Sequence, residues 1–207
     1  DKPVDLPHGK SEMEVEREMA SLAKRNISTG TVPSFLGTGA YRHHVPATVD
    51  YVIQRGEFLT AYTPYQPEIA QGTLQALFEF QTQVALLTDM DVANASLYDG
   101  ATATAEAALM ANRVTRREKI LASGNLHPHY AGTVDTLARQ TGFTFKELSP
   151  STAGSDIAAL KDQIDSETSA VIVQYPDIFG HIVDFTSLAE AAHAAGALLI
   201  VVTTEIV

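Results

Sequence analysis

Short apolar runs alternate with helix-like segments through the second half of the chain, and this alternation limits the fold more than any other feature. The runs "KILAS" (119–123), "FTFKEL" (143–148) and "SAVIVQY" (169–175) each precede a segment whose apolar residues recur at helical spacing. Strands that are separated by single helices and short loops predict βαβ units and a parallel sheet. We therefore expect an α/β fold, with residues 91–207 as its large α/β domain and residues 1–90 as a helical and loop-rich extension that serves as an interface segment.

The last predicted helix and strand make further expectations possible. Ser187 and Glu190 have capping-box spacing, which predicts that the last helix begins there. The run "GALLIVVTTEIV" (196–207) is almost wholly apolar, as in a central strand that is buried on both faces. Because a central strand needs neighbours, we expect the α/β domain to be incomplete at its C-terminus in this sequence. The alternative is a chain that simply finishes on a strand.

Helices are also predicted in the first part of the chain. Ser11 and Glu14 form a second pair with capping-box spacing, and a helical pattern follows them. A helix over 46–54 would have a proline in its first turn, where proline is well tolerated. In the segment 73–90, the side chains of Leu74, Leu77, Phe78 and Val84 fall on one face, which predicts a helix.

Composition and charge exclude several classes of function. Lys and Arg number 14 against 25 Asp and Glu, and the resulting net charge of −11 is unfavourable for binding nucleic acid. No apolar run approaches the length that spans a bilayer, and the absence of cysteine excludes disulfides and thiolate metal sites. His43 and His44 are adjacent, but no H-x-x-x-H spacing or accompanying Asp in the sequence indicates a metal site. We expect a cytoplasmic protein that binds neither nucleic acid nor membrane.

The stretch "SLYDGATA" (96–103) lies directly ahead of an alanine-rich helical pattern. Free backbone N–H groups and the positive end of the helix dipole would converge at Asp99, Gly100 and Thr102, where they could hold a phosphate. Gly100 lacks a side chain that would block a close approach, and Thr102 offers a hydroxyl. The alternative, which holds for most capped helices, is that Asp99 is an ordinary N-cap and Gly100 a turn residue.

Histidine and tyrosine side chains follow the predicted strands. The stretch "HPHY" (127–130) comes after the first strand, and "YPDIFG" (175–180) comes after the third. In an open parallel sheet, the loops beyond the carboxyl ends of the strands form the ligand crevice. We expect His127, His129 and Tyr130 to lie at this crevice, where a flat ligand could stack on them. The alternative is that the two histidines are surface turn residues.

The loop "YTPYQPEIAQG" (62–72) differs from an ordinary connection between helices. Its two prolines restrict the backbone and so reduce the conformational entropy that is lost when the loop becomes ordered. Tyr62 and Tyr65 each present an apolar ring and a hydroxyl, which ligand sites and interfaces favour, and Glu68 is the loop's only charge. The composition predicts a loop that serves a pocket or an interface. The alternative is a loop that packs on its own core.

The lysines of the chain show no pattern of a covalent anchor. None of the six follows a predicted strand in the small-residue context that a Schiff-base lysine would have. We therefore expect the covalent group of any such chemistry to lie outside this sequence. The six are Lys2, Lys10, Lys24, Lys119, Lys146 and Lys161.

Two long stretches resemble the P-protein family of the glycine cleavage system. They are "FLGTGAYRHHVPATVDYVIQRGEFLTAYTPYQPEIAQGTLQALFEFQT" (35–82) and "DVANASLYDGATATAEAALMANR" (91–113), and the similarity extends through "YPDIFG". It is greatest to subunit 1, the alpha chain, of the two-chain members. The resemblance implies a fold-type-I transferase fold that depends on pyridoxal 5′-phosphate, a beta chain (subunit 2) that supplies the cofactor lysine, and an alpha2beta2 assembly. The implied reaction is loss of CO2 from glycine and transfer of the aminomethyl group to the lipoyl arm of the H-protein, with pyridoxal phosphate as the electron sink.

The resemblance also implies roles for particular residues. Tyr62, Tyr65 and Glu68 would serve catalysis at the interface with the beta chain, and Thr63 would contact the substrate. The cofactor would lie at the equivalent of the phosphate turn, near four residues: Asp99, Gly100, Thr102 and His129. The chain departs from the pattern at its last strand, where "VTTE" (202–205) stands in place of the Asp that many such enzymes pair with the pyridinium nitrogen.

Two other functions remain open from the sequence. One is a stand-alone pyridoxal-phosphate enzyme, such as an aminotransferase or a desulfurase, whose lysine lies downstream of this sequence. The other is a non-catalytic scaffold subunit that stabilises its partner and docks the H-protein. A lysine directly after a downstream strand would favour the first. A colourless alpha chain that forms a yellow pair with its partner would instead fit the shared site at the interface.

Overall fold

The computed structural model describes residues 4–35 and 42–206, which fall into two compact units, Asp1–His43 and His44–Val207. The first unit contains helix α1 (Glu12–Ala23). The Glu14 carboxylate accepts hydrogen bonds of 2.8 Å from the backbone N–H and the hydroxyl of Ser11, so the predicted capping box forms. The placement of a domain boundary at residue 90 stays a prediction.

The second unit opens with three helices: α2 (Ala47–Ile53), α3 (Gly56–Leu59) and α4 (Gln71–Thr88). Helices α2 and α4 confirm the helices predicted over 46–54 and 73–90, whereas the single turn of α3 was not predicted. No residue of these three helices is buried, although they carry many apolar side chains. Among the residues that the model describes, no helix combines the length and the apolar character needed to cross a membrane.

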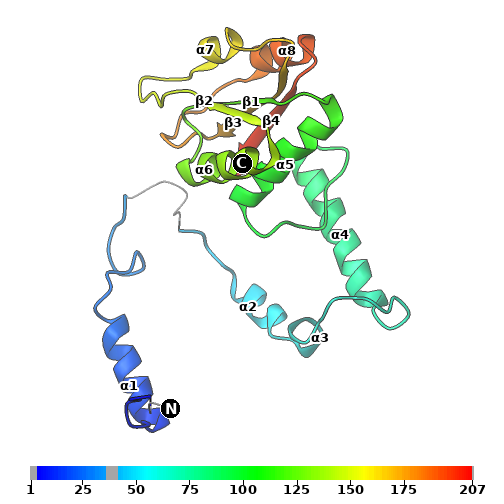
Figure 1. Ribbon diagram of the computed structural model, residues 1–207. Helices are drawn as coiled ribbons and strands as arrows, with labels where there is room; N and C mark the ends of the chain where they lie inside the picture. The colour runs from blue at the N-terminus through cyan, green and yellow to red at the C-terminus, as the bar shows by residue number, and fades with distance from the viewer. Residues whose placement is uncertain (1–3, 36–41, 207) are drawn as a thin grey trace. The chain divides into compact units, whose positions relative to one another are not determined.

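A four-stranded parallel sheet forms the centre of the α/β part, which confirms the predicted fold class (Figure 1). Its strands are β1 (Lys119–Ala122), β2 (Thr144–Glu147), β3 (Thr168–Tyr175) and β4 (Leu198–Thr203). The order across the sheet is β2-β1-β3-β4, and every pair is parallel. The strands predicted from the apolar runs are therefore the strands of the sheet.

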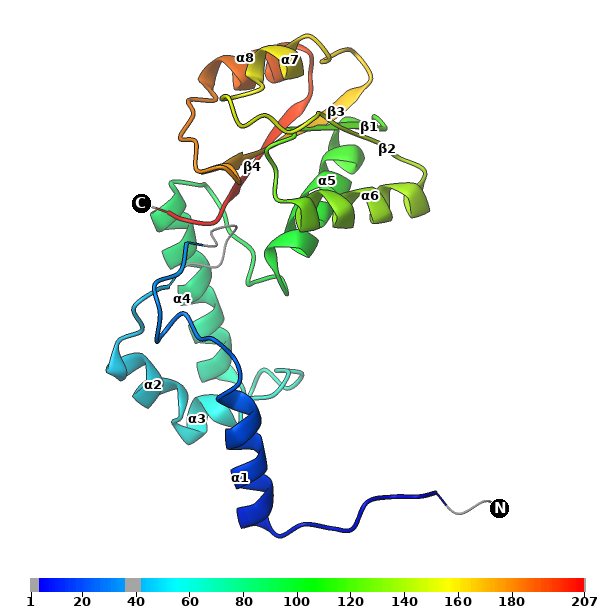
Figure 2. The same cartoon turned by 90° about the vertical axis from the view of Figure 1, so that its left-hand side faces the viewer.

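Helices cover both faces of the sheet. Helices α5 (Gly100–Thr115) and α6 (Pro128–Thr141) lie on one face, and α7 (Ile157–Lys161) and α8 (Thr186–Ala194) lie on the other (Figures 1 and 2). This arrangement explains why β1 and β3 are apolar at every central position. Strands that are covered on both faces lack the polar alternation of a half-exposed sheet.

The core consists of two layers that the pleat of the strands separates. Ile120 and Ile172 point to the face that α5 and α6 cover, where they pack with alanines of those helices. Leu121 and Val171, one position along, point to the face of α7 and α8. All four side chains are almost fully buried. The small residues of α5 allow this helix to approach the sheet closely, as its alanine-rich sequence predicts.

The expected start of the last helix was wrong. Helix α8 begins at Thr186 rather than at a Ser187 cap, and the Asp184 carboxylate accepts hydrogen bonds from the Thr186 backbone N–H and hydroxyl at 2.8 and 2.6 Å. The last strand, β4, lies at the edge of the described sheet and is partly exposed, because it pairs only with β3. The expectation that this run is a central strand of a longer domain stays a prediction.

Candidate functional site

The candidate site lies at the carboxyl edge of the sheet, where the connections from two adjacent strands diverge. From β1 the chain passes to β2 on one side, and from β3 it passes to β4 on the other side. Such a switch point is where open α/β sheets bind their ligands. Three segments meet at this edge: the start of α5, the loop from β1 to α6, and the loop after β3.

The start of α5 is capped by its own side chain. Asp99 is the N-cap, and its Oδ1 accepts a hydrogen bond of 2.8 Å from the Thr102 backbone N–H. The Thr102 hydroxyl donates to the Asp99 carbonyl at 3.2 Å. A Cβ atom at Gly100 would overlap the hydroxyl of Tyr130, so only glycine permits this close approach of α6 to α5. The geometry is that of an ordinary helix N-cap at Asp99. The close contact with Tyr130 explains why residue 100 is a glycine.

This turn does not by itself fit the phosphate of pyridoxal phosphate. One of the backbone N–H groups that would bind a phosphate is already bonded to Asp99, and the carboxylate adds a negative charge next to the position of the anion. The lysine nearest in sequence, Lys119, donates to the Gln163 carbonyl at 2.7 Å and to Asp165 at 2.6 Å. It lies at the first residue of β1, at the opposite edge of the sheet.

Three rings form a cluster at the start of α6. His127 is the N-cap, and its Nδ1 accepts a hydrogen bond of 3.1 Å from the His129 backbone N–H. The His127 ring lies 5.0 Å from the His129 ring and 5.1 Å from the Tyr130 ring, measured between centroids. The Gln174 side chain accepts a hydrogen bond of 2.8 Å from the His127 backbone N–H and so holds the cluster against β3. The structure thus brings His129 and Gly100 to the same site through two intermediate side chains, since the His127 ring neighbours that of His129 and the Tyr130 ring packs between His127 and Gly100.

A buried polar network joins the loops that follow β1 and β3. Asn125 is 2% exposed, and its amide donates to the Asp177 carboxylate at 2.8 Å. Asp177 is 6% exposed, and it also pairs with Nδ1 of His181 at 2.8 Å. The loop after β1 is held from a second side, because Asp156 accepts hydrogen bonds from Ser123 and from the Gly124 backbone N–H.

The sequence did not identify Asn125, Asp177 and His181 as a group. The only available signal was an acidic residue directly after a strongly apolar strand, in "YPD". Within residues 4–35 and 42–206, no three or more His, Asp or Glu side chains come together in a way that could hold a metal ion. The contacts of this network are hydrogen bonds that join the loop after β1 to the loop after β3.

Hydrogen bonding lowers the pKa of Asp177 below its ordinary value. Burial alone would raise this pKa, because it disfavours the charged carboxylate. Hydrogen bonds to the carboxylate together outweigh this effect of burial. They come from the backbone N–H and ring of His181, the Asn125 amide and the Phe179 backbone N–H. The carboxylate form is therefore more stable in the folded protein than in the unfolded chain.

This shift predicts how an Asp177→Asn variant responds to pH. A carboxylate with a depressed pKa stabilises the fold above its unfolded pKa of about 4, and this stabilisation disappears as the pH falls through the lower folded value. At pH 7, the variant should therefore lose about 1–3 kcal/mol of unfolding free energy. In urea titrations of the full-length protein, the difference in unfolding free energy between the variant and wild type should shrink toward pH 3. A difference that is the same at both pH values would contradict this account.

The loop between α3 and α4 projects its rings into solvent. Tyr62 and Tyr65 are 86% and 84% exposed, so they do not pack on a core within the described chain. The Tyr65 backbone N–H donates to the Thr63 carbonyl at 2.9 Å, which curls the loop around a shallow hollow of about 340 Å³. Tyr62, Thr63 and Tyr65 line this hollow, whereas Glu68 lies outside its lining.

The predicted site residues therefore form two groups. Asp99, Gly100, Thr102 and His129 lie at the carboxyl edge of the sheet, and the other four belong to the loop. Within residues 42–206, no hydrogen bond or ring contact joins the loop to the carboxyl edge. The functional roles that we assigned to the two groups stay predictions. The four loop residues are Tyr62, Thr63, Tyr65 and Glu68.

The chain is similar to curated proteins over its whole length. The model of the glycine cleavage system P-protein family matches residues 1–207. A probable glycine dehydrogenase (decarboxylating) subunit 1 of Caulobacter vibrioides is 63% identical over 207 residues, which are 100% of this chain and 46% of the relative. The corresponding protein of Novosphingobium aromaticivorans is 65% identical over 201 residues, 97% of this chain and 44% of the relative. The chain thus spans about half the length of these relatives.

Solved structures agree with this similarity. A crystal structure of glycine decarboxylase (P-protein) of the glycine cleavage system, in inhibitor-bound form, superposes with a TM-score of 0.88 at 42% identity, over 98% of this chain and 45% of that one. A sphingosine-1-phosphate lyase of Burkholderia pseudomallei reaches a TM-score of 0.64 at 14% identity, over 97% of this chain and 49% of that one, which shows a shared fold alone. Since both the family model and close relatives cover the entire sequence, the chain belongs to the glycine cleavage system P-protein family.

Proposed function

We propose that the protein to which this chain belongs is subunit 1 of a two-chain glycine decarboxylase. The observation that carries this proposal is the identity of 63% to a probable glycine dehydrogenase subunit 1 across all 207 residues. The reaction would be decarboxylation of glycine in the cytoplasm, followed by transfer of the aminomethyl group to the lipoyl arm of the H-protein. Two copies of each subunit would form the active alpha2beta2 assembly.

We place the covalent anchor of pyridoxal phosphate on the companion subunit. The cofactor supplies an electron sink for the electron pair that CO2 leaves on the glycine carbon. The start of α5 is a capped helix with a carboxylate at the turn, and it does not by itself fit the cofactor phosphate. None of the six lysines in this chain has the sequence context of an anchor. Both features support a site that two chains share.

The contribution of this chain would come from the loop around Tyr65. Tyr62 and Tyr65 would wall the channel that admits glycine and the lipoyl arm, and would exclude water from it. Thr63 would contact the substrate, and Glu68 would accept a hydrogen bond from its amine or position a tyrosine. The exposure of both rings supports this proposal, because a side chain that completes a neighbour's site must project from its own chain.

The exchange of labelled bicarbonate into the carboxyl group of glycine tests the proposal. The assay needs the full-length protein, its companion subunit, pyridoxal phosphate and the H-protein. We expect exchange by the assembled pair and none above background by either subunit alone. Exchange by the full-length protein alone would indicate a stand-alone enzyme. Full exchange by the companion alone would leave this chain a scaffold, and either result would refute a shared site.

A further inference from the structure

The start of α6 is held by an imidazole. His127 is the N-cap of this helix, a position that Ser, Thr, Asp and Asn occupy most often. Its carbonyl accepts hydrogen bonds from the Tyr130 and Ala131 backbone N–H groups at 2.9 and 3.1 Å. Pro128 has no N–H group, so the His129 N–H is the remaining donor of the first turn, and Nδ1 of His127 accepts from it at 3.1 Å. One residue therefore satisfies the N–H groups from His129 to Ala131.

This contact requires a neutral His127 ring. A backbone N–H can only donate, so Nδ1 must offer a lone pair, and the proton of the neutral ring lies on Nε2. The imidazolium form carries a proton on both nitrogen atoms and has no acceptor to offer. Protonated His127 would also place a positive charge at the positive end of the helix dipole. The capped start and the charged ring therefore exclude each other.

Loss of this cap would disturb the ring cluster at the carboxyl edge. The His127 ring lies 5.0 Å from the His129 ring and 5.1 Å from the Tyr130 ring. Two imidazolium rings at the first of these distances would repel each other, so protonation of both histidines also favours separation of the rings. The Tyr130 ring packs against Gly100 at the start of α5, and this contact would change with the cluster. The Gln174 side chain would still hold the His127 backbone N–H against β3.

A protonated His127 would find no carboxylate partner in the described part of the chain. Within residues 42–206, its ring makes no ion pair, and the side chain that contacts this residue from β3 is the uncharged Gln174. Charged and titratable groups do lie on the elements around the start of α6, but none of them forms a hydrogen bond or an ion pair with the ring. These groups are Asp99, Glu106 and Arg113 at α5, Lys146 and Glu147 on β2, Asp135 and Arg139 further along α6, and Asp177 and His181 after β3.

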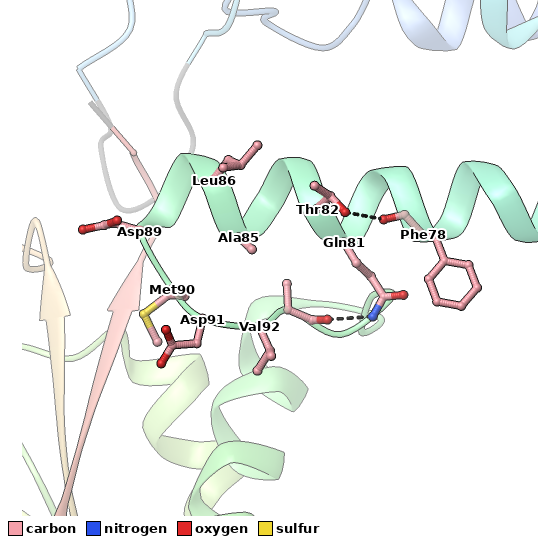
Figure 3. Close-up of a pocket in the computed structure, with 10 residues that line it drawn as sticks. Phe78, Gln81, Thr82, Ala85, Leu86, Asp89, Met90, Asp91 and Val92 are labelled. Atoms are coloured by element: carbon pink, nitrogen blue, oxygen red, sulfur yellow. Dashed lines mark hydrogen bonds between the residues drawn. The ribbon is translucent and has the colours of Figure 1, made fainter.

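Other helix ends in this chain are held by groups that keep their charge near neutral pH. The Asp184 carboxylate accepts a hydrogen bond of 2.8 Å from the Thr186 backbone N–H at the start of α8. At the C-terminal end of α4, beside a groove of about 480 Å³, the Gln81 amide donates a hydrogen bond of 2.7 Å to the Ala93 carbonyl (Figure 3). Carboxylates ionise well below neutral pH and amides do not titrate, whereas a histidine changes its charge between about pH 5 and 8. The cap of α6 is therefore the pH-sensitive contact among the three.

We propose that His127 makes the start of α6 a pH-sensitive switch. The neutral ring caps the helix and keeps the ring cluster in place. As the pH falls through the range in which histidine titrates, the open first turn binds the proton that the capped turn excludes, and the equilibrium shifts toward the open form. The carboxyl edge thus changes its shape in mildly acidic solution while the sheet persists. This inference concerns the chain itself and does not depend on the proposed function.

Hydrogen exchange of the full-length protein tests the switch. We expect the protection of amides 129–132, corrected for the intrinsic exchange rate at each pH, to fall about fivefold between about pH 7.5 and 5, the ratio that corresponds to a typical N-cap. The amides of β3 should keep their protection, which shows that the sheet stays folded. His127→Asn replaces the imidazole with a side chain that caps helices well and does not titrate, so in this variant the protection should change less than about twofold.

His193→Asn is the matched control. His193 is exposed in the last turn of α8, where a positive charge is favourable to the helix dipole, so this variant should leave the pH response of α6 intact. The same pH response in wild type and His127→Asn would overturn the proposal. Constant protection of the first turn of α6 in the wild-type protein would also overturn it.

Nitrogen-15 NMR of the imidazole rings is a second test, which needs only the wild-type full-length protein. At about pH 7.5, His127 should show a protonated Nε2 and an unprotonated Nδ1. A proton on Nδ1 in the folded protein would overturn the proposal, because that nitrogen could not then accept the hydrogen bond from His129.

Discussion

We expect replacement of Tyr65 with alanine to lower glycine–bicarbonate exchange by the assembled pair about 100-fold, the loss typical when a group that positions the substrate is removed. The ring of Tyr65 is 84% exposed in this chain and lines the hollow of its loop. In the shared site, its removal would open the channel to water and let glycine shift from its reactive position. Because the neighbouring prolines keep the loop stiff, the rest of the loop cannot close the gap.

Two further variants make the Tyr65 result specific. Tyr51→Ala removes another exposed tyrosine, 73% exposed on α2 and outside the loop, and should leave the exchange rate within about twofold of wild type. Tyr65→Phe keeps the ring, and separates its packing role from that of the hydroxyl. The mass of each assembled pair shows whether subunit binding is intact. An unchanged rate for Tyr65→Ala in an intact pair would remove this loop from the active site.

The parallel sheet could be predicted from the sequence because burial on both faces leaves a direct pattern. In "SAVIVQY", apolar and small residues fill nearly every position, and β3 covers the same residues with its side chains buried. Helix α4 was predictable for a similar reason, since its apolar residues recur at helical spacing. Both features depend on local periodicity, which a single sequence shows.

The carboxyl edge could be predicted only in outline. The sequence placed His129 near this edge through strand order, and the family resemblance placed Asp99 near the cofactor. Neither indicated that the Tyr130 hydroxyl packs against Gly100. Asn125 and Asp177 are 52 residues apart in the chain, and their hydrogen bond depends on how β1 and β3 align. Such contacts depend on tertiary geometry and have no local sequence pattern.

The neighbours of β4 could not be predicted either. Its run of leucine, isoleucine and valine indicates burial, yet the number of neighbours that a strand has is a property of the whole sheet. The start of α8 was missed for a more local reason. Ser187 and Glu190 have the spacing of a capping box, but Asp184 bonds to the Thr186 N–H and hydroxyl and starts the helix earlier.

The second large effect concerns which subunit holds the cofactor. Pyridoxal phosphate is added to the full-length protein without its companion, and free cofactor is removed by gel filtration. We then expect no stable absorbance at about 400 nm, whereas the assembled pair should keep the colour of the bound cofactor. The physical reason is that the α5 turn carries a carboxylate where a phosphate would bind, and that no lysine of this chain has the sequence context of an anchor. Absorbance that is stable and stoichiometric in the unpaired protein would contradict this expectation.

Borohydride reduction of the assembled, cofactor-loaded pair, followed by peptide mass spectrometry, tests the shared site most directly. Reduction fixes the cofactor to the amine that holds it, and the mass of the labelled peptide identifies the subunit. We predict one labelled lysine per pair, on the companion subunit, with all six lysines of this chain unmodified. A stoichiometric label on any lysine of the full-length subunit 1 would show that this subunit carries its own anchor, and the account of a shared site would be wrong.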